Sequence, residues 1–332
     1  MDHRSASVDA FRLLAACLVF FCHSIYTSQA SLLTLLGLLG RWIIPFFFLV
    51  SGYYFQKSYT RQPRYAFSKI AKGLLAVTLF VNLFYLAFIG LVEGSLVTIA
   101  NHFTLLVGTY FHLWFLTSMM LGYIVLWFLL TFGLERLMPN VAAVFLLLIL
   151  SLAPYNTLFG LSPHPMYARS LLSIPFLCIG FLIARHALDT TVSTAVSWLL
   201  IGVGIGIQIA ESRWLASHGS DPLKVNFLGG TLLLSAGMFL LSLQVSMANQ
   251  NWLSYYGRRY SFSLYLYHPV VNYFLYEAYK TSTLGAIIYW MSPLLALATM
   301  LLLLIGVDKF APPLFRILNG DFSQPRLVRK PG

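Results

Sequence analysis

A chain of 332 residues that is 59% hydrophobic and only 9% charged cannot coat a water-soluble globule, since soluble domains carry roughly 25% charged residues. Its apolar residues fall in runs close to the ~20 residues needed to cross a bilayer, so the composition excludes a soluble protein and indicates a polytopic membrane protein. The net charge of +11 comes from basic residues between those runs, where positive charge sets orientation, and we expect contact with anionic lipid and no nucleic-acid partner.

The apolar segments predict an all-α transmembrane bundle of ten spans. Residues 1–310 are expected to form this bundle and residues 311–332 a basic cytoplasmic tail. The stretch 94–110 is less apolar, which favours an interfacial or re-entrant helix. The first segment lacks a cleavage pattern and is predicted to be a retained helix. The predicted spans are 8–27, 36–56, 68–91, 112–132, 139–154, 170–187, 193–210, 226–246, 261–279 and 285–307.

The distribution of Lys and Arg predicts which side of the membrane each loop faces. If the N-terminus is cytoplasmic, 16 of these residues lie inside and 5 lie outside. Cytoplasmic loops carry the excess of positive charge in membrane proteins. We therefore expect both termini to be cytoplasmic, which agrees with an even number of spans.

The cysteines, histidines and glycines show no cofactor-binding pattern. Cys17, Cys22 and Cys178 lie in apolar runs without a CxxC pair, so they are interpreted as small core residues. The histidines have no HExxH or similar spacing, and no metal is expected. A GxGxG run at 202–206 follows no predicted strand, which favours a packing surface over a nucleotide loop.

Two ionisable residues lie within the first predicted span. Arg12 and His23 are eleven residues apart, which on a helix is three turns plus roughly 20° and about 16 Å of rise, so they share one face. Arg12 suits a snorkelling anchor at the cytoplasmic boundary, and His23 suits a hydrogen-bonded residue between helices. Their shared face favours a joint function instead. Asp9 lies one turn before Arg12 and is expected to pair with it.

Further polar residues lie near the ends of later spans. Arg41 opens the second span, and His112 and Trp114 lie at the outer end of the fourth. The aromatic belt of a membrane interface explains Trp114 equally well. His268 lies within the ninth span, directly before Pro269, where a polar residue between helices is the alternative interpretation.

Histidine and arginine side chains that converge on a membrane cavity suit acyl transfer. A neutral His takes the proton of a hydroxyl as that hydroxyl attacks a thioester. Arg holds phosphates through bidentate hydrogen bonds. Apart from Asp9, no acidic residue lies deep in a predicted span, so a paired-carboxylate mechanism lacks candidates.

The order of these motifs resembles the membrane acyltransferase family 3. Asp9-x-x-Arg12 followed by ten residues and His23 is similar to the signature of that family. Many members have an Asp before the Phe pair of the second span. This chain has Ile44-Pro45 there, like the single-domain polysaccharide acetyltransferases, so no role of that Asp is carried over. The later landmarks, in the order of the family, are Ser51-Gly52-Tyr53, His112-Leu113-Trp114-Phe115-Leu116 and Ser261-Phe262-Ser263-Leu264-Tyr265-Leu266-Tyr267-His268-Pro269.

The resemblance implies an enzyme of the bacterial cytoplasmic membrane. It would transfer an acyl group, usually acetyl, from cytoplasmic acyl-CoA to a hydroxyl of an extracytoplasmic glycan or lipid-linked saccharide. Acetyl-CoA is then the cosubstrate, and membrane lipids and a surface glycan are the partners. His23 is expected to be the general base or a transient acyl carrier, with Arg12 as its catalytic partner. The expected donor-binding residues are Arg12, Asp9, Lys57, Arg258 and Arg259. The expected acceptor-binding residues are Arg41, His112, Trp114, Tyr265 and His268.

Two other classes of protein compete with this hypothesis. A transporter or flippase of a lipid-linked sugar would use the intramembrane Arg and His to bind phosphate. A membrane sensor would need a soluble output domain, and no loop is long enough for one. The sequence leaves open the acceptor glycan, the acyl group and the oligomeric state.

Overall fold

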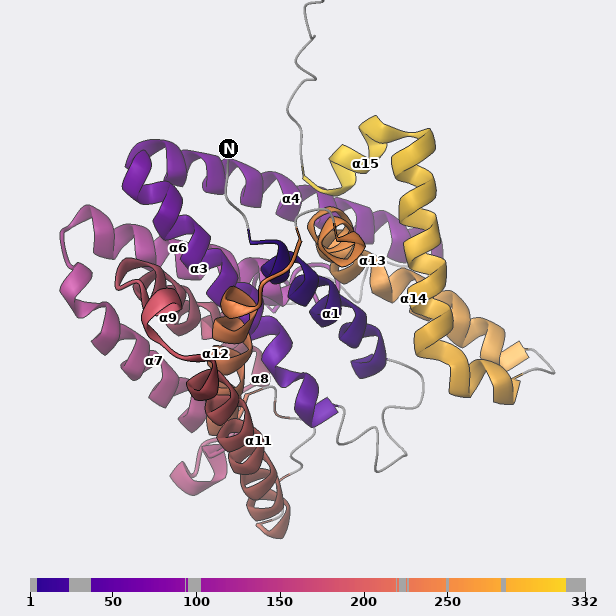
Figure 1. The fold of residues 1–332 in the computed structure, drawn as a ribbon. Coiled ribbons are helices and arrows are strands. Elements are labelled where there is room, and N and C mark those ends of the chain that lie inside the picture. Colours follow the sequence, from indigo (N-terminus) through magenta and orange to yellow (C-terminus); the bar gives the residue numbers. More distant parts are fainter. Residues whose placement is uncertain are drawn as a thin grey trace, which may run out of the picture.

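The computed structural model describes residues 5–23, 37–92, 94, 103–218, 220, 225, 227–248, 251–281 and 285–320. Every regular element in these residues is a helix (Figure 1), which confirms the all-α prediction. The longer helices are α1 (Ala6–Cys22), α3 (Ile43–Arg61), α4 (Pro63–Val92), α6 (Trp114–Thr131), α7 (Met138–Leu152), α9 (Ser173–Arg185), α11 (Thr194–Ser217), α12 (Gly229–Gln244), α13 (Trp252–Thr281) and α14 (Gly285–Phe310). The shorter ones are η1 (Gly40–Trp42), α5 (Thr104–Val107), η3 (Glu135–Leu137), η4 (Asn156–Phe159), α8 (Pro165–Leu171), α10 (Leu188–Thr191) and α15 (Pro312–Leu318).

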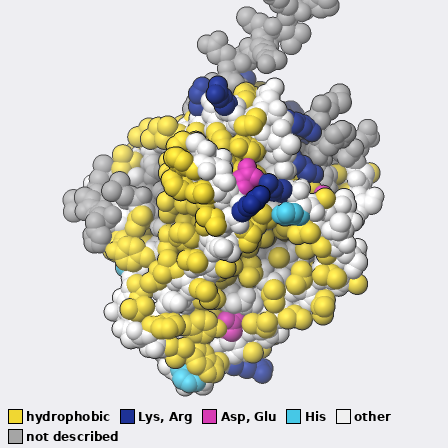
Figure 2. Space-filling view, turned by 90° about the vertical axis from the view of Figure 1, so that its left-hand side faces the viewer, with side chains coloured by type: hydrophobic (Ala, Val, Ile, Leu, Met, Phe, Trp, Pro, Cys, Tyr) yellow, Lys and Arg dark blue, Asp and Glu magenta, His cyan; other side chains and the backbone are white. Residues whose placement is uncertain are grey.

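Seven stretches of the described chain are long and apolar enough to cross a membrane. Three further predicted spans are helical but differ from these: α1 has 17 residues, α12 has 16, and α13 is rich in tyrosine and serine. Figure 2 shows a face covered mostly by hydrophobic side chains, with Lys and Arg gathered mainly in its upper part. The protein is therefore a multi-pass membrane protein, with seven spans supported by composition where ten are predicted. The seven stretches are Gly37–Arg61, Pro63–Val92, Trp114–Thr131, Glu135–Leu152, Pro165–Arg185, Thr194–Ser217 and Ile288–Phe310.

Several helix boundaries differ from the predicted ones. Helix α13 begins at Trp252 where apolarity predicts 261, and α11 continues to Ser217 where it predicts 210. Hydropathy predicts only the apolar part of a helix, so it misses the polar residues by which these helices extend further. The predicted span 170–187 corresponds to the stretch Pro165–Arg185, which consists of two consecutive helices, α8 and α9. Pro175 has no N–H for the carbonyl of Leu171, one turn earlier, which accounts for the break.

Several predicted segments are described only in part. Residues 24–27 of the predicted span 8–27 lie outside the described residues. From 94–110, residues 94 and 103–110 are described and include α5, so the interfacial or re-entrant helix stays a prediction. From the predicted tail 311–332, residues 311–320 are described. There α15 packs through its buried Phe315, whose ring lies 5.4 Å from that of Tyr260 on α13. The rest of the tail lies outside the described residues.

Glycines set the closest helix contacts of the bundle. A Cβ added at Gly52 on α3 would meet the carbonyl of Leu177, and one at Gly180 on α9 would meet that of Leu49. A Cβ at Gly257 on α13 would collide with the carbonyl oxygen of Asp9 on α1. The backbones of α3 and α9, and of α1 and α13, therefore touch. This places α1 against α13 and positions the cavities described below.

The GxGxG run lies on α11 and is only partly a packing surface. A Cβ at Gly204 would meet the backbone of α12, whereas Gly202 and Gly206 have no heavy atom within 4 Å of such a Cβ. Residues two positions apart on a helix point about 200° apart, so only the middle glycine faces the neighbour. The interpretation as a packing surface is right for Gly204 and wrong for the other two.

Candidate active site

A cavity of about 410 Å³, here called the histidine cavity, is lined by the ends of several helices. It receives His23 from the end of α1, Arg41 from η1, His112 from the turn before α6, and Arg169 from α8. Trp114 and Tyr265 complete its aromatic wall. The cavity therefore gathers two histidines and two arginines from segments far apart in the sequence.

His23 lies at the C-terminal end of α1, where both its backbone N–H and its carbonyl make hydrogen bonds. It caps the C-terminus of α1, with its N–H 3.1 Å from the carbonyl oxygen of Val19. Its own carbonyl accepts a hydrogen bond from Nδ2 of Asn272 on α13, at 3.1 Å. Its ring lines the cavity beside Phe111, whose ring centroid is 5.7 Å away. The residue is therefore anchored through its backbone, with its imidazole in the cavity wall.

Two more histidines lie behind His23. The ring of His268 stacks on that of His23 at 5.2 Å, and the ring of His112 lies 5.3 Å from that of His268. His268 is fully buried and does not line the cavity, whereas His112 does. The predicted acceptor residue His268 therefore packs against the ring of His23 and is not among the residues that line the cavity.

Backbone carbonyls of α13 set the orientation of these two rings. Nδ1 of His268 lies 2.7 Å from the carbonyl oxygen of Tyr265. This carbonyl lacks its usual helical partner, because Pro269, four residues later, has no N–H. Nε2 of His112 lies 2.8 Å from the carbonyl oxygen of Leu266. A carbonyl only accepts, so each of these nitrogens donates its proton. The opposite nitrogens, Nε2 of His268 and Nδ1 of His112, are buried and make no hydrogen bond with the described residues.

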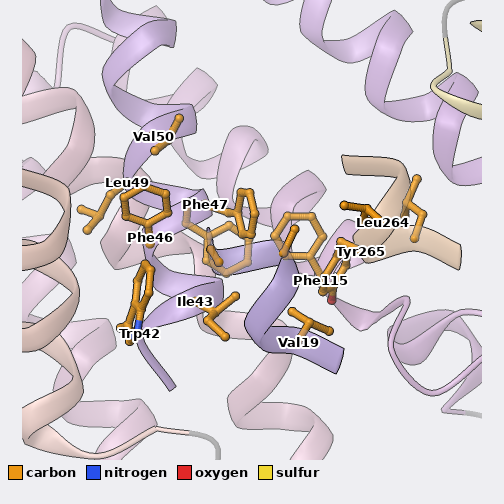
Figure 3. Close-up of a cluster of buried hydrophobic side chains, with 14 of the residues drawn as sticks. Val19, Trp42, Ile43, Phe46, Phe47, Leu49, Val50, Phe115, Leu264 and Tyr265 are labelled. Carbon is orange, nitrogen blue, oxygen red and sulfur yellow. The ribbon is translucent and has the colours of Figure 1, made fainter. Parts of the chain in front are cut away.

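Three buried aromatic rings form a layer at the base of the histidine cavity. Phe115 lies 5.0 Å from Tyr265 and 6.4 Å from Phe47, and Phe47 lies 6.4 Å from Tyr265. In Figure 3, Phe47 and Phe115 lie between Val50 above and Val19 and Ile43 below. The hydroxyl of Tyr265 donates to the carbonyl oxygen of His112 at 3.1 Å, which ties this aromatic layer to the histidines.

A second cavity, of about 550 Å³, lies on the other side of the aromatic layer. Phe47, Phe115 and Val50 belong to its wall, whereas Val19, Ile43 and Tyr265 belong to the histidine cavity, and the described walls share no residue. Four basic side chains and no carboxylate line it among the described residues, and we call it the basic cavity. Its basic residues are Arg12, Lys57, Arg61 and Lys69.

The predicted donor residues divide into two groups. Arg12 and Lys57 line the basic cavity. Asp9 is buried outside that wall, where it pairs with Arg12 at 3.2 Å, as predicted, and with Arg258 at 3.5 Å. Arg259 instead makes a two-point ion pair with Asp308 of α14. Asp9 and Arg258 are thus placed to orient Arg12, and Arg259 joins two helices away from the cavity.

Sequence reasoning missed three residues that line these cavities and one that bonds His23. Arg61 and Lys69 line the basic cavity, and Arg169 lines the histidine cavity. Membrane orientation explains Arg61 and Lys69 on the predicted cytoplasmic side, and nothing in the sequence singled out Arg169 on the predicted outer side. Asn272 lies one turn after His268 on α13, and that spacing is the one signal that would have linked it to the site.

Metal binding has no support in the described residues, where no group of three or more His, Cys, Asp or Glu side chains is arranged to hold an ion. The cavities instead supply imidazoles on one side and fixed cations on the other. Such a set can accept a proton, stabilise an oxyanion and bind phosphates.

A known protein family matches nearly the whole chain. The profile of the acyltransferase domain matches residues 5–308. No curated protein and no solved structure gives a significant match. The matched range contains both cavities and the aromatic layer between them. The chain therefore belongs to acyltransferase family 3.

Proposed function

We propose that this protein transfers an acyl group, in the first instance acetyl, from cytoplasmic acyl-CoA to a hydroxyl of an extracytoplasmic glycan or lipid-linked saccharide. The observation that carries the proposal is the pair of cavities with different chemistry, separated by one aromatic layer. The count of Lys and Arg on each side favours an orientation with the basic cavity toward the cytoplasm. The donor and the acceptor then approach from opposite faces.

The basic cavity suits the phosphates of coenzyme A. Arg12, Lys57, Arg61 and Lys69 supply four cations without a carboxylate in the described wall. Arg offers a planar fork of N–H donors for phosphate oxygens, and Lys offers a mobile point charge. Asp9 fixes the guanidinium of Arg12 by the 3.2 Å ion pair. The thioester end would extend from these groups across the aromatic layer.

The histidine cavity suits the acceptor and the chemical step. His23 takes the proton of the acceptor hydroxyl as the oxygen attacks the thioester carbonyl. The new ester C–O bond forms, the C–S bond breaks, and the coenzyme A thiolate leaves and takes up a proton. Arg41 and His112 line the same cavity, where Arg41 would position the acceptor or stabilise the oxyanion and His112 would position the acceptor. His268, fully buried behind His23, keeps the ring in place.

The direct test uses purified protein in proteoliposomes, acetyl-CoA labelled in the acetyl group, and extracted cell-envelope glycans. We expect label to move from the thioester to the glycan only when both are present. Mass spectrometry of the envelope glycans with and without the gene would then name the acceptor. Transbilayer movement of a lipid-linked sugar with the thioester untouched would overturn the proposal in favour of a flippase.

A further inference from the structure

A third cavity adjoins the histidine cavity on the side of α8. Its volume is about 350 Å³, and it shares Arg169, Leu172 and Val225 with the histidine cavity. The rest of its wall comes from the end of α7, from η4, from α8 and the residues that lead into it, and from Ser220 and Phe227 between α11 and α12. We call it the α8 cavity. The shared wall makes it a side chamber of the candidate active site.

We propose that the α8 cavity binds the sugar unit next to the one that is acylated. The acceptor is then an oligosaccharide of at least two units, lying across Arg169. This inference rests on the proposed function and extends it from a hydroxyl acceptor to a class of glycan.

The wall of the α8 cavity matches the two-sided chemistry of a sugar ring. A sugar presents hydroxyls around its rim and C–H groups on its faces. The wall offers polar side chains that donate and accept hydrogen bonds, together with flat apolar proline rings. The polar residues are Asn156, Thr157 and Ser220, and the prolines are Pro154, Pro163 and Pro165.

Arg169 is held at the junction of the two cavities. Its guanidinium carbon lies 5.9 Å from the ring centroid of Trp114, and its Nη1 lies 3.7 Å from Sδ of Met166. A guanidinium group has five N–H donors in one plane. From this position it faces both chambers, so it can donate to hydroxyl or carboxylate oxygens of two neighbouring sugar units.

Both volumes leave room for one sugar unit in each chamber. A volume of about 350 Å³ lies within the range of about 300–1,000 Å³ that is usual for small-molecule sites. The histidine cavity, at about 410 Å³, is slightly larger. It therefore has room for the reacting sugar beside His23.

The experiment compares acceptors of increasing length. Monosaccharide, disaccharide and trisaccharide fragments of the extracted envelope glycan are offered to the purified protein with labelled acetyl-CoA. For the unmodified protein we expect kcat/KM to rise at least tenfold from the monosaccharide to the disaccharide, a difference of about 1.4 kcal/mol. Extension to the trisaccharide should add less than the first step.

Two variants test the cavity itself. Thr157→Trp places a bulky ring in the α8 cavity and should reduce the disaccharide advantage to near unity. Asn156→Ala should reduce the advantage severalfold without added bulk. Leu158→Trp is the matched control, because Leu158 is the next residue, is exposed and lines neither cavity. It should retain the full advantage.

The outcomes separate this inference from the proposed function. Equal use of monosaccharide and disaccharide by the unmodified protein overturns the subsite and leaves acyl transfer standing. An equal loss on both acceptors in Thr157→Trp overturns it too, because it would show a change in the reacting centre. No transfer to any fragment or to the intact glycan overturns the proposed function.

Discussion

The basic cavity and the histidine cavity lie back to back, and they differ in their chemistry. The described wall of the basic cavity carries four Lys and Arg side chains and no histidine, which suits binding of a polyanion. The histidine cavity adds two imidazoles to its two arginines, and the imidazole of His112 donates to the backbone carbonyl oxygen of Leu266. Under the proposed function, donor binding and the chemical step are divided between the two faces. Changes on each face should therefore alter different kinetic constants.

The largest effect is expected from His23→Ala. Removal of a general base lowers rates by about 10²–10⁴-fold, and we expect a loss of transfer in that range while the protein stays in the membrane. His218→Ala is the control, because His218 is exposed and its Nδ1 bonds the carbonyl of Trp214 in its own helix. Labelled-glycan yield, divided by the amount of protein in the membrane, measures both. Undiminished transfer in His23→Ala would refute the assignment.

Arg12→Gln should affect the donor side. A hydrogen bond to a charged group contributes about 1.5–3 kcal/mol, so KM for acetyl-CoA should rise about tenfold to a hundredfold. The acceptor KM should stay constant. Asp9 keeps Arg258 as an ion partner, which limits damage to the fold. Arg64→Gln, an exposed position outside the basic cavity, should leave both constants unchanged. A rise confined to the acceptor KM would reverse the roles of the two cavities.

Gly257→Ala should separate α13 from α1 on the donor side. The added Cβ would collide with the carbonyl oxygen of Asp9, and overpacking of this kind costs about 1–3 kcal/mol. We expect a lower melting temperature in detergent and a larger rise in donor KM than in acceptor KM. Gly202→Ala has open space around its Cβ and should be neutral or slightly stabilising. Equal melting temperatures for the two variants would contradict the close contact.

Tyr265→Phe should give the smallest effect. It keeps the aromatic ring of the layer and removes only the hydroxyl that donates to the carbonyl oxygen of His112. One hydrogen bond contributes about 0.5–1.5 kcal/mol. Without it, we expect a severalfold lower kcat with donor KM unchanged. Tyr267→Phe removes a hydroxyl bonded to the carbonyl of Leu318, away from both cavities, and should leave kcat unaltered. A larger loss in that control would point to a general effect of packing on α13.

Much of the fold was predictable, because long apolar runs in the sequence indicate which segments cross the membrane. The helical repeat also predicted that Arg12 and His23 share one helix face. In the structure, Arg12 lines the basic cavity and His23 lines the histidine cavity. The boundary at Trp252 was not predictable from apolarity, because the first turns of α13 are polar and aromatic. The division between α8 and α9 depends on one proline within an apolar run.

The candidate site was less predictable, because a basic residue near the end of a span can serve membrane orientation, a cavity, or both. Arg61 and Lys69 occupy positions where membrane orientation already explains a basic residue, and only the tertiary fold brings them to a cavity. Arg259 shows the reverse case. It follows the same rule and belongs to the predicted donor set, yet Asp308 on α14 holds it elsewhere. Pairing between distant helices leaves no periodic trace in the sequence.

The aromatic layer of Phe47, Phe115 and Tyr265 has an electrical consequence. Two water-filled cavities that approach it from opposite sides would carry the potential of their own compartments inward. The membrane voltage would then fall mainly across the three rings, where moving one elementary charge through 100 mV changes its energy by about 2.3 kcal/mol. A thiolate formed at this depth would experience that field. Transfer by proteoliposomes should therefore change when a voltage is imposed, and equal rates at opposite voltages would show that the field falls elsewhere.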